Sequence, residues 1–388
     1  MSGRQFIQSP GPTNIPDSVL EAFRRPALDF GGPEFGALVD SLFAELPDLF
    51  GGAHRVVMHP SVGHGSWEAT LVNLLEPGAR LLLPASGLFS MRWADMANDL
   101  GYRAETFPVD LRRAPDPAEI QARLAADTGH QIQALLVAHV ETSTGTMADL
   151  AAIREALDDA GHPALFVVDA IASFGTEWIP MVELGVDAVL AASQKGLMMP
   201  PGLSLVGLSE RAVEVARRGG SPRSYWNWGQ RFEPEWTYQR FGGTPPEQHI
   251  YAFRAALDLI NDEGGIRAVA DRHRRFATAV HRTVEAWGTE GSWELNATVP
   301  VERASSITCI RTGDIDADEL RLTARDRFGV VVGGGMLELA GSAIRIGHLG
   351  DLNEPMLLGA LGGVELAMAH LGLPHGPGLR AAVESLAS

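Results

Sequence analysis

Short apolar runs alternate with helical patterns from about Ile15 to Leu208, and this alternation constrains the fold more than any other feature of the chain. Each run ends at residues typical of turns, a pattern typical of buried β-strands. The expected strands are Val56–Met58, Arg80–Leu83, Ile132–Ala138, Leu165–Val168, Ala188–Ala191 and Leu203–Val206. Strands that alternate with helices form a mostly parallel sheet covered by helices on both faces. The sequence therefore predicts an α/β fold.

A lysine and an aspartate follow two of these strands. Lys195 lies after the apolar run Val186–Ala192, and Asp169 follows the run Ala164–Val168. Both side chains should project from the carboxyl ends of strands, where α/β proteins bind ligands. A lysine amine forms a Schiff base with an aldehyde, and a carboxylate keeps a pyridine nitrogen protonated, so the pair suits pyridoxal 5'-phosphate. Without that cofactor, Lys195 would cap a strand in a surface turn and Asp169 would cap a helix.

Three further segments carry groups that such a cofactor needs. His59–Ser66 is a turn of small residues before the helical pattern Trp67–Leu75, and the first amides of a helix bind phosphate. Phe89 follows a strand-ending turn, where its ring could stack on a flat cofactor. His139–Gly145 places a polar cluster after the strand Ile132–Ala138. The first segment could be an ordinary strand-to-helix connection and Phe89 a core aromatic, whereas the polar cluster is hard to explain by packing.

The order of these segments, read with the block Arg345–Asp351, resembles the class V aminotransferases of the fold-type I pyridoxal-phosphate family, and most closely their serine–glyoxylate and alanine–glyoxylate branch. The resemblance extends from Pro10-Gly11-Pro12-Thr13 to the C-terminal helical tail, and Ser193–Gly196 with Pro200-Pro201-Gly202 is among its most specific blocks. It implies a large domain, residues 15–260, with a mostly parallel sheet of the seven-stranded type. A smaller α/β domain, residues 261–388, would be joined by residues 1–14. A homodimer with shared active sites is also implied.

The resemblance assigns a role to individual residues. Lys195 becomes the Schiff-base lysine, and Asp169 the partner of the pyridine nitrogen. The other cofactor-binding residues would be Gly63, His64 and Gln194 at the phosphate, Phe89 stacked on the ring, Thr142 at the phenolic oxygen and Thr244 at the phosphate of the neighbouring subunit. Arg345 would bind the substrate α-carboxylate through two parallel bonds. Phe30 and Gly31 would shape the side-chain end of the site, because a His-Arg pattern common there in relatives is absent.

The implied reaction moves an amino group from a small L-amino acid, serine or alanine, to glyoxylate or a similar 2-oxo acid, with ping-pong kinetics. Aspartate–glyoxylate transfer stays open, because Arg92 or Arg240 could supply a second cation. Pyridoxamine–pyruvate transfer is disfavoured by Met336, where those relatives carry a second arginine. A desulfurase or related lyase is disfavoured because Cys309, inside the strand-like Ile307–Ile310, does not lie on an exposed loop. A non-catalytic ligand-binding protein would have no need of the lysine.

Composition excludes several other classes of partner. A formal net charge of −17 argues against nucleic acids and acidic membranes, whose phosphates demand clustered basic residues. One cysteine excludes an internal disulfide and suits a reducing cytoplasm. The N-terminus has no apolar signal region, and no apolar run is long enough to span a bilayer. We therefore expect a cytoplasmic enzyme without a metal site.

The segment Arg217–Thr244 is rich in Arg, Gly, Trp, Tyr and Pro. It could pack locally as a loop, but a long loop in a compact domain usually has a function, which favours an arm that crosses to a neighbouring subunit. Tyr225, Trp226 and Trp228 would then be its anchors, and Phe241 replaces a tyrosine common in relatives. The elements expected after this segment are helices Glu247–Asn261 and Gly265–Trp287, strand Ser306–Arg311, helix Asp316–Phe328, strands Val330–Val332 and Ala343–Ile346, and helix Glu354–Leu371.

Overall fold

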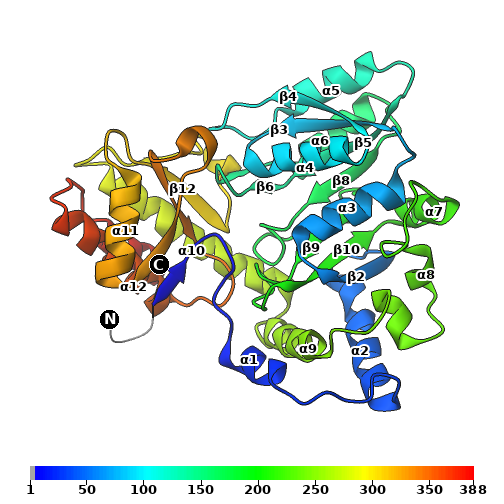
Figure 1. The fold of residues 1–388 in the computed structure, drawn as a ribbon. Helices are drawn as coiled ribbons and strands as arrows, with labels where there is room; N and C mark the ends of the chain where they lie inside the picture. The colour runs from blue at the N-terminus through cyan, green and yellow to red at the C-terminus, as the bar shows by residue number, and fades with distance from the viewer. Residues whose placement is uncertain (1–4) are drawn as a thin grey trace.

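The computed structural model describes residues 5–388, and its larger part is built on one seven-stranded sheet (Figure 1). In spatial order the strands are β2 (Arg55–Ser61), β10 (Gly202–Leu208), β9 (Ala188–Ala192), β8 (Leu165–Asp169), β5 (Ile132–Ala138), β3 (Arg80–Ala85) and β4 (Arg103–Pro108). The five strands from β9 to β4 pair in parallel, while β10 lies antiparallel to both β2 and β9. The predicted α/β fold with a mostly parallel sheet is confirmed.

Helices cover both faces of this sheet. Alternate residues of a strand point to opposite faces, so Leu82 belongs to one apolar core while Leu81 and Leu83 belong to the other. The first core includes side chains of α1 (Asp17–Phe23), α2 (Pro33–Leu49), α5 (Pro117–Ala126), α6 (Leu150–Asp159) and α9 (Glu247–Asp262), and the second those of α3 (Gly63–Leu74), α4 (Leu88–Asp99) and α7 (Glu210–Arg218). The sheet is therefore buried on both faces, as the continuous apolar strands require.

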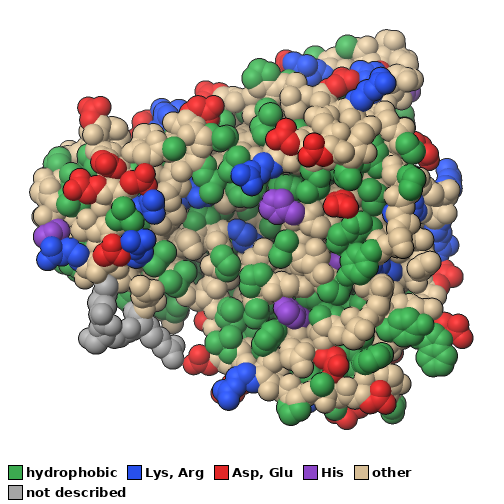
Figure 2. Space-filling model, viewed as in Figure 1, with side chains coloured by type: hydrophobic (Ala, Val, Ile, Leu, Met, Phe, Trp, Pro, Cys, Tyr) green, Lys and Arg blue, Asp and Glu red, His purple; other side chains and the backbone are tan. Residues whose placement is uncertain are grey.

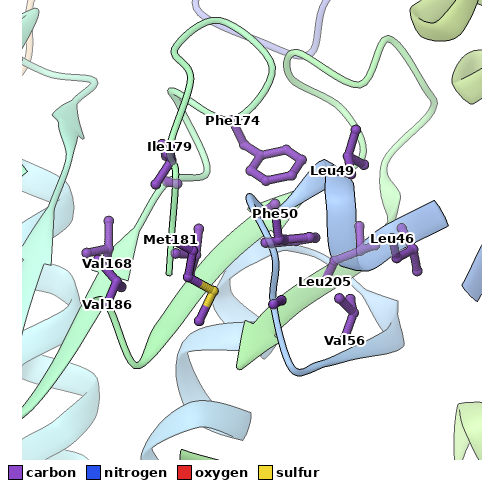
Figure 3. Packing of buried hydrophobic residues seen from close by; sticks show 14 of the residues in the cluster. Leu46, Leu49, Phe50, Val56, Val168, Phe174, Ile179, Met181, Val186 and Leu205 are labelled. Atoms are coloured by element: carbon purple, nitrogen blue, oxygen red, sulfur yellow. The ribbon is translucent and has the colours of Figure 1, made fainter. Parts of the chain in front are cut away.

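Part of the first core lies where α2 ends against β10 (Figure 3). The rings of Phe50 and Phe174 lie 4.4 Å apart between centroids, with Leu205 and Met181 nearby in the same cluster. Strand β8 ends at Asp169, and Phe174 belongs to the loop that begins directly after it. This packing therefore anchors one of the loops that shape the ligand-binding edge of the sheet.

A second sheet forms the smaller C-terminal part, at the left of Figure 1. Its strands, in spatial order, are β1 (Phe6–Gln8), β13 (Val330–Gly334), β14 (Ala343–Gly347), β12 (Ile307–Arg311) and β11 (Glu294–Leu295). It shares a core with α10 (Ile266–Trp287), α11 (Ala317–Phe328), α12 (Glu354–His370) and α13 (Gly378–Ala387). Helix α10 links the two parts, because Ile266 packs in the larger core and Trp287 in the smaller one. The domain boundary expected at residue 260 stays a prediction.

The two-residue strand β11 has no counterpart among the expected strands, and neither do two other strands of these sheets. Strand β4 lies at the edge of the large sheet, and most of its side chains are partly or fully exposed, so it lacks the apolar run by which buried strands are recognised. Strand β1 has only three residues and pairs with β13, more than three hundred residues away in the sequence. Both omissions reflect a weak local signal.

The segment between α7 and α9 packs on its own chain more than expected. It contains the short helices α8 (Gly229–Phe232) and η1 (Thr237–Phe241). Trp228 is fully buried, and its indole nitrogen donates to Nε2 of His59 at 3.0 Å. Trp226 donates to Glu68 on α3 at 3.0 Å. The prediction that Trp228 anchors a neighbouring subunit is therefore wrong, whereas that for the partly exposed Trp226 stays a prediction.

Other aromatic side chains of the same segment do reach the surface. Tyr225, Trp236 and Tyr238 are all more than 40% exposed. Large hydrophobic side chains protrude at the lower right of Figure 2, where α8 and its flanking loops lie in Figure 1. The remaining short elements are the hairpin β6 (Val140–Glu141) and β7 (Thr146–Met147) and the turns η2 (Pro300–Glu302) and η3 (Leu337–Leu339). Within residues 5–388 no helix is long and apolar enough to cross a membrane.

Candidate active site

Loops that follow the carboxyl ends of several strands of the large sheet surround a cavity of about 190 Å³. This is the edge at which parallel α/β sheets bind ligands. Seven of the residues predicted from sequence line the cavity: Gly63, His64, Phe89, Thr142, Asp169, Gln194 and Lys195. The fold thus brings together groups from five separate segments of the chain.

Asp169 is the last residue of β8, and its carboxylate is buried against the cavity. One carboxylate oxygen accepts the backbone N–H of Ile171 at 2.8 Å, and the other accepts the indole N–H of Trp67 at 3.0 Å. Burial raises the pKa of Asp169 to about 6, against the opposing effect of these two hydrogen bonds. A cation that enters the cavity beside Asp169 would stabilise its ionised form.

Lys195 follows β9 and is the only lysine in the 388 residues. Its amine donates to the backbone carbonyl of Pro10, and a Cβ on Gly11 would lie 2.6 Å from the same nitrogen. Gly11 has a φ of +107°, so the N-terminal segment passes close over the lysine only because glycine is present. Burial, with a smaller effect of the Arg345 charge, lowers the pKa of Lys195 to about 8. A substantial fraction of the amine is therefore neutral near physiological pH.

The N-terminus of α3 provides an anion-binding end to the cavity. Gly63 is the first residue of this 12-residue helix, and its N-terminal amides have no partner within the helix. A Cβ on Gly63 would lie 2.4 Å from Cδ1 of Ile171, so any larger residue there would require the Ile171 side chain to shift. The buried Oε1 of Gln194 has no hydrogen-bond partner among the described residues. A ligand hydrogen at this end would satisfy that orphaned acceptor.

Arg345, on β14 of the smaller sheet, is 5% exposed. Its Nε donates to the carbonyl of Gly334 at 2.8 Å, and its Nη1 donates to the carbonyl of Thr142 at 2.9 Å. Burial lowers the pKa of this guanidinium, and no acid of residues 5–388 forms an ion pair with it. The bond to Thr142 holds Arg345 beside the cavity, so the smaller sheet contributes to the same site.

Four predicted site residues do not line the cavity of this chain: Arg345, which bonds to the lining residue Thr142, and Phe30, Gly31 and Thr244. Phe30 and Gly31 lie in the exposed turn before α2, with the side chain of Phe30 38% exposed. Thr244 is exposed after η1. Arg240, considered as a second substrate cation, forms an ion pair with Asp40 at 3.1 Å. Phe30, Gly31, Thr244 and Arg240 therefore contribute nothing to the cavity lining within one chain.

Sequence reasoning missed three contributors to the site. Trp67 was expected only as the start of a helix, although a buried indole N–H needs an acceptor, here Asp169. Pro10 and the following Gly11 were read as part of a family block and not as neighbours of the lysine. The sequence also contains a clearer signal for Lys195. It is the only lysine in the chain, so a specific role is a better explanation for it than surface charge.

Comparison with known proteins agrees with this geometry. The chain matches the sequence model of the family "Aminotransferase class-V" over residues 48–337. It is 35% identical to the serine–glyoxylate aminotransferase of Methylorubrum extorquens over 390 aligned residues, 99% of this chain and 96% of that protein. The chain belongs to the class V aminotransferases. This class V enzyme therefore has the family's transaminase scaffold along nearly its whole length.

Other relatives carry different substrate names on the same scaffold. The L-aspartate–glyoxylate aminotransferase of Paracoccus denitrificans is also 35% identical and is covered over 96% of its length, with 99% of this chain. Among solved structures, the pyridoxamine–pyruvate aminotransferase of Mesorhizobium loti superposes on this chain with a TM-score of 0.89 at 26% identity. The match covers 100% of this chain and 98% of that one. The scaffold is thus shared among enzymes with different substrates, and substrate choice must lie in the details of the site.

Proposed function

We propose that this class V aminotransferase uses pyridoxal 5'-phosphate to transfer an amino group from a small L-amino acid, serine or alanine, to glyoxylate or a similar small 2-oxo acid. The observation that carries the proposal is the meeting of the only lysine, Lys195, with the buried carboxylate of Asp169 in one cavity next to Arg345. An amine, a carboxylate for a ring nitrogen and a guanidinium for a substrate carboxylate are the three groups that the reaction needs.

The residues present fit this cofactor. Asp169 would hold the pyridine nitrogen, the amides of α3 with His64 and the side-chain N–H donors of Gln194 would hold the phosphate, Phe89 would stack on the ring and Thr142 would bond the phenolic oxygen. When bound, pyridoxal phosphate supplies an aldehyde that condenses with amines and a cationic ring that withdraws electrons from the substrate. Trp67 supports the same function by fixing one oxygen of Asp169.

Lys195 would then carry the proton in the chemical step. Its lowered pKa of about 8 leaves a neutral amine available to remove the substrate α-proton and, once protonated, to return it. Arg345 would hold the substrate α-carboxylate with its remaining N–H donors, while its bond to Thr142 fixes the guanidinium plane. Because every amino donor and oxo acceptor shares an α-carboxylate, one arginine serves both half-reactions.

Three alternatives to this reaction differ in their support: aspartate–glyoxylate transfer, pyridoxamine–pyruvate transfer and a desulfurase. An aspartate–glyoxylate relative at 35% identity keeps aspartate in consideration, and Arg92, whose charge acts on His64 at the cavity wall, is the available second cation. The pyridoxamine–pyruvate alternative rests on structural likeness and lacks an arginine at Met336. A desulfurase has little support, because Cys309 is 3% exposed within β12 and burial raises the pKa of its thiol to about 12.

We further propose that the enzyme works as a homodimer in the cytoplasm. Thr244, Phe30 and Gly31 lie on the surface of the chain, and the aromatic side chains of Trp236 and Tyr238 are also exposed. In a dimer these residues could complete the cavity of the neighbouring subunit, at its phosphate and side-chain ends. Aromatic residues of this kind are enriched in subunit interfaces.

The function is tested with the purified protein, pyridoxal phosphate and glyoxylate. We expect glycine to form with serine or alanine as donor, and more slowly with aspartate. Reduction with borohydride should link one cofactor to each chain, at the single lysine, which peptide mass spectrometry would locate. Failure to form glycine from any amino acid, or cofactor linked only at the N-terminal amine, would contradict the proposal.

A further inference from the structure

A buried carboxylate lies behind the cavity wall and takes no part in the roles described above. Glu141, in β6, is 1% exposed. Its Oε1 accepts the N–H of Phe89 at 3.3 Å, and the N–H and hydroxyl of Ser143 at 3.0 and 2.6 Å, while its Oε2 accepts the N–H of Ser90 at 3.0 Å. All four donors are uncharged. A buried anion held by neutral donors is costly unless the donors are aligned.

The alignment comes from helix α4. Phe89 and Ser90 belong to its first turn, where the helix dipole and free amides favour a negative charge. The side chain can approach this turn because Gly87 has no Cβ, which would lie 2.6 Å from Cγ of Glu141. Ser143 strengthens the contact, since its hydroxyl also accepts the N–H of Leu88 at 3.0 Å. The hairpin β6–β7 and helix α4 are therefore joined through one carboxylate.

Three cavity components meet at this junction. Phe89 lines the cavity from α4, and Thr142, the residue after Glu141, lines it from the hairpin. Arg345 donates to the carbonyl of Thr142 from the smaller sheet. We propose that Glu141 is a positioning residue that holds Phe89 and Thr142 in register with Arg345. The proposal rests on the proposed function for the roles of those three residues, but the junction exists in the cofactor-free protein and can be measured there.

Glu141→Gln tests the proposal with little change of shape. The amide oxygen can keep the three bonds of Oε1, including that from Phe89, but the amide NH₂ then faces the N–H of Ser90, so one of the two bonds to α4 is lost. In the cofactor-free protein, the amides of Leu88 to Ser90 should exchange faster while those of α12 do not change. Binding of pyridoxal phosphate can be measured by the quenching of tryptophan fluorescence. We expect the variant to bind it with a dissociation constant about tenfold higher than that of wild type. Exposed Glu155 on α6 offers the matched control, Glu155→Gln, with the same change of charge.

Each outcome decides the proposal. A role in stability alone predicts a lower melting temperature with unchanged cofactor affinity and no selective exchange in α4, and that result would overturn the positioning role. If Glu141→Gln does not fold, Ser143→Ala removes one donor and should shift exchange and affinity in the same direction by a smaller factor; no shift would equally overturn it. A wild type that binds the cofactor but does not transaminate would contradict the proposed function, and the exchange measurement would still decide the role of Glu141.

Discussion

The cavity and the surface that carries Phe30, Gly31 and Thr244 differ in how they are built. The cavity is buried and assembled from strand ends whose positions are fixed by a continuous sheet. The other residues lie in exposed turns on the outside of the same chain. In the proposed homodimer, one chain would supply the amine chemistry and a second copy would supply part of the phosphate and side-chain contacts.

Lys195→Ala should have the largest effect, because it removes the only lysine. We expect turnover to fall to trace level and borohydride to link no cofactor inside the cavity, while far-UV circular dichroism stays that of wild type. Exposed Arg103→Ala on β4 serves as a control for loss of one positive charge elsewhere. Amine transfer above a trace level in Lys195→Ala would remove the lysine from the mechanism.

Asp169→Asn should lower the chemical step by several orders of magnitude while leaving cofactor binding largely intact. A neutral amide keeps only one of the two bonds from Trp67 and Ile171, because its NH₂ replaces one acceptor oxygen, and it cannot stabilise a protonated ring nitrogen. Single-turnover kinetics with serine would measure the step. A rate within a few-fold of wild type would show that Asp169 does not govern the ring charge.

Arg345→Lys should weaken donor and acceptor together. An ammonium keeps the charge but loses the planar two-point contact, so we expect KM to rise roughly 10- to 100-fold for both amino acid and glyoxylate. Specificity constants for serine, alanine and glyoxylate provide the test. If only one of the substrates is affected, the two half-reactions do not share this arginine.

Mixed dimers test whether exposed Thr244 contributes to the cavity of a neighbouring subunit. A Lys195→Ala chain paired with a Thr244→Ala chain contains one site with neither change if Thr244 acts across the interface. Co-purified heterodimers should then recover about half of the wild-type activity per dimer, while each parent dimer stays impaired, as expected when one of two sites is intact. An inactive heterodimer would place the phosphate contacts within one chain.

The smallest effect concerns the proton on Lys195. Burial disfavours the ammonium, so the lysine of the cofactor-free protein should become reactive as pH rises through about 8, below the ordinary value of 10.5. Acylation of the single lysine, followed by mass spectrometry over roughly pH 6 to 10, would measure this midpoint. Asp169→Asn should shift it lower, because the aspartate charge favours the protonated lysine. A midpoint near that of an exposed lysine would show that the amine is solvated.

Much of this architecture was accessible from the sequence, because each feature left a local trace. Buried strands such as β5 and β8 are apolar runs, and polar residues of the candidate active site lie at or just after their ends. Edge strand β4 and the terminal strand β1 left no such trace. The contacts of Trp67 with Asp169 and of Pro10 with Lys195 join residues far apart in the chain, so they depend on tertiary packing that no local pattern records.

The aromatic segment shows the opposite error. The aromatic composition of the segment Arg217–Thr244 predicts that its tryptophans anchor an interface. Trp228 instead packs on His59 of its own chain. Composition alone cannot distinguish a side chain that seals the chain's own core from one that seals a neighbour. The exposed Tyr225, Trp236 and Tyr238 are the residues to examine in a dimer.

The most direct test of the central claim is a half-reaction without any acceptor. The purified protein, loaded with pyridoxal phosphate, is titrated with single amino acids while its visible absorbance is recorded. The account predicts that serine or alanine converts the cofactor stoichiometrically to its amine form, that glyoxylate then restores the starting spectrum, and that aspartate acts more weakly. A spectrum that no amino acid alters would contradict transaminase function, and a strong preference for aspartate would overturn the choice of a small donor.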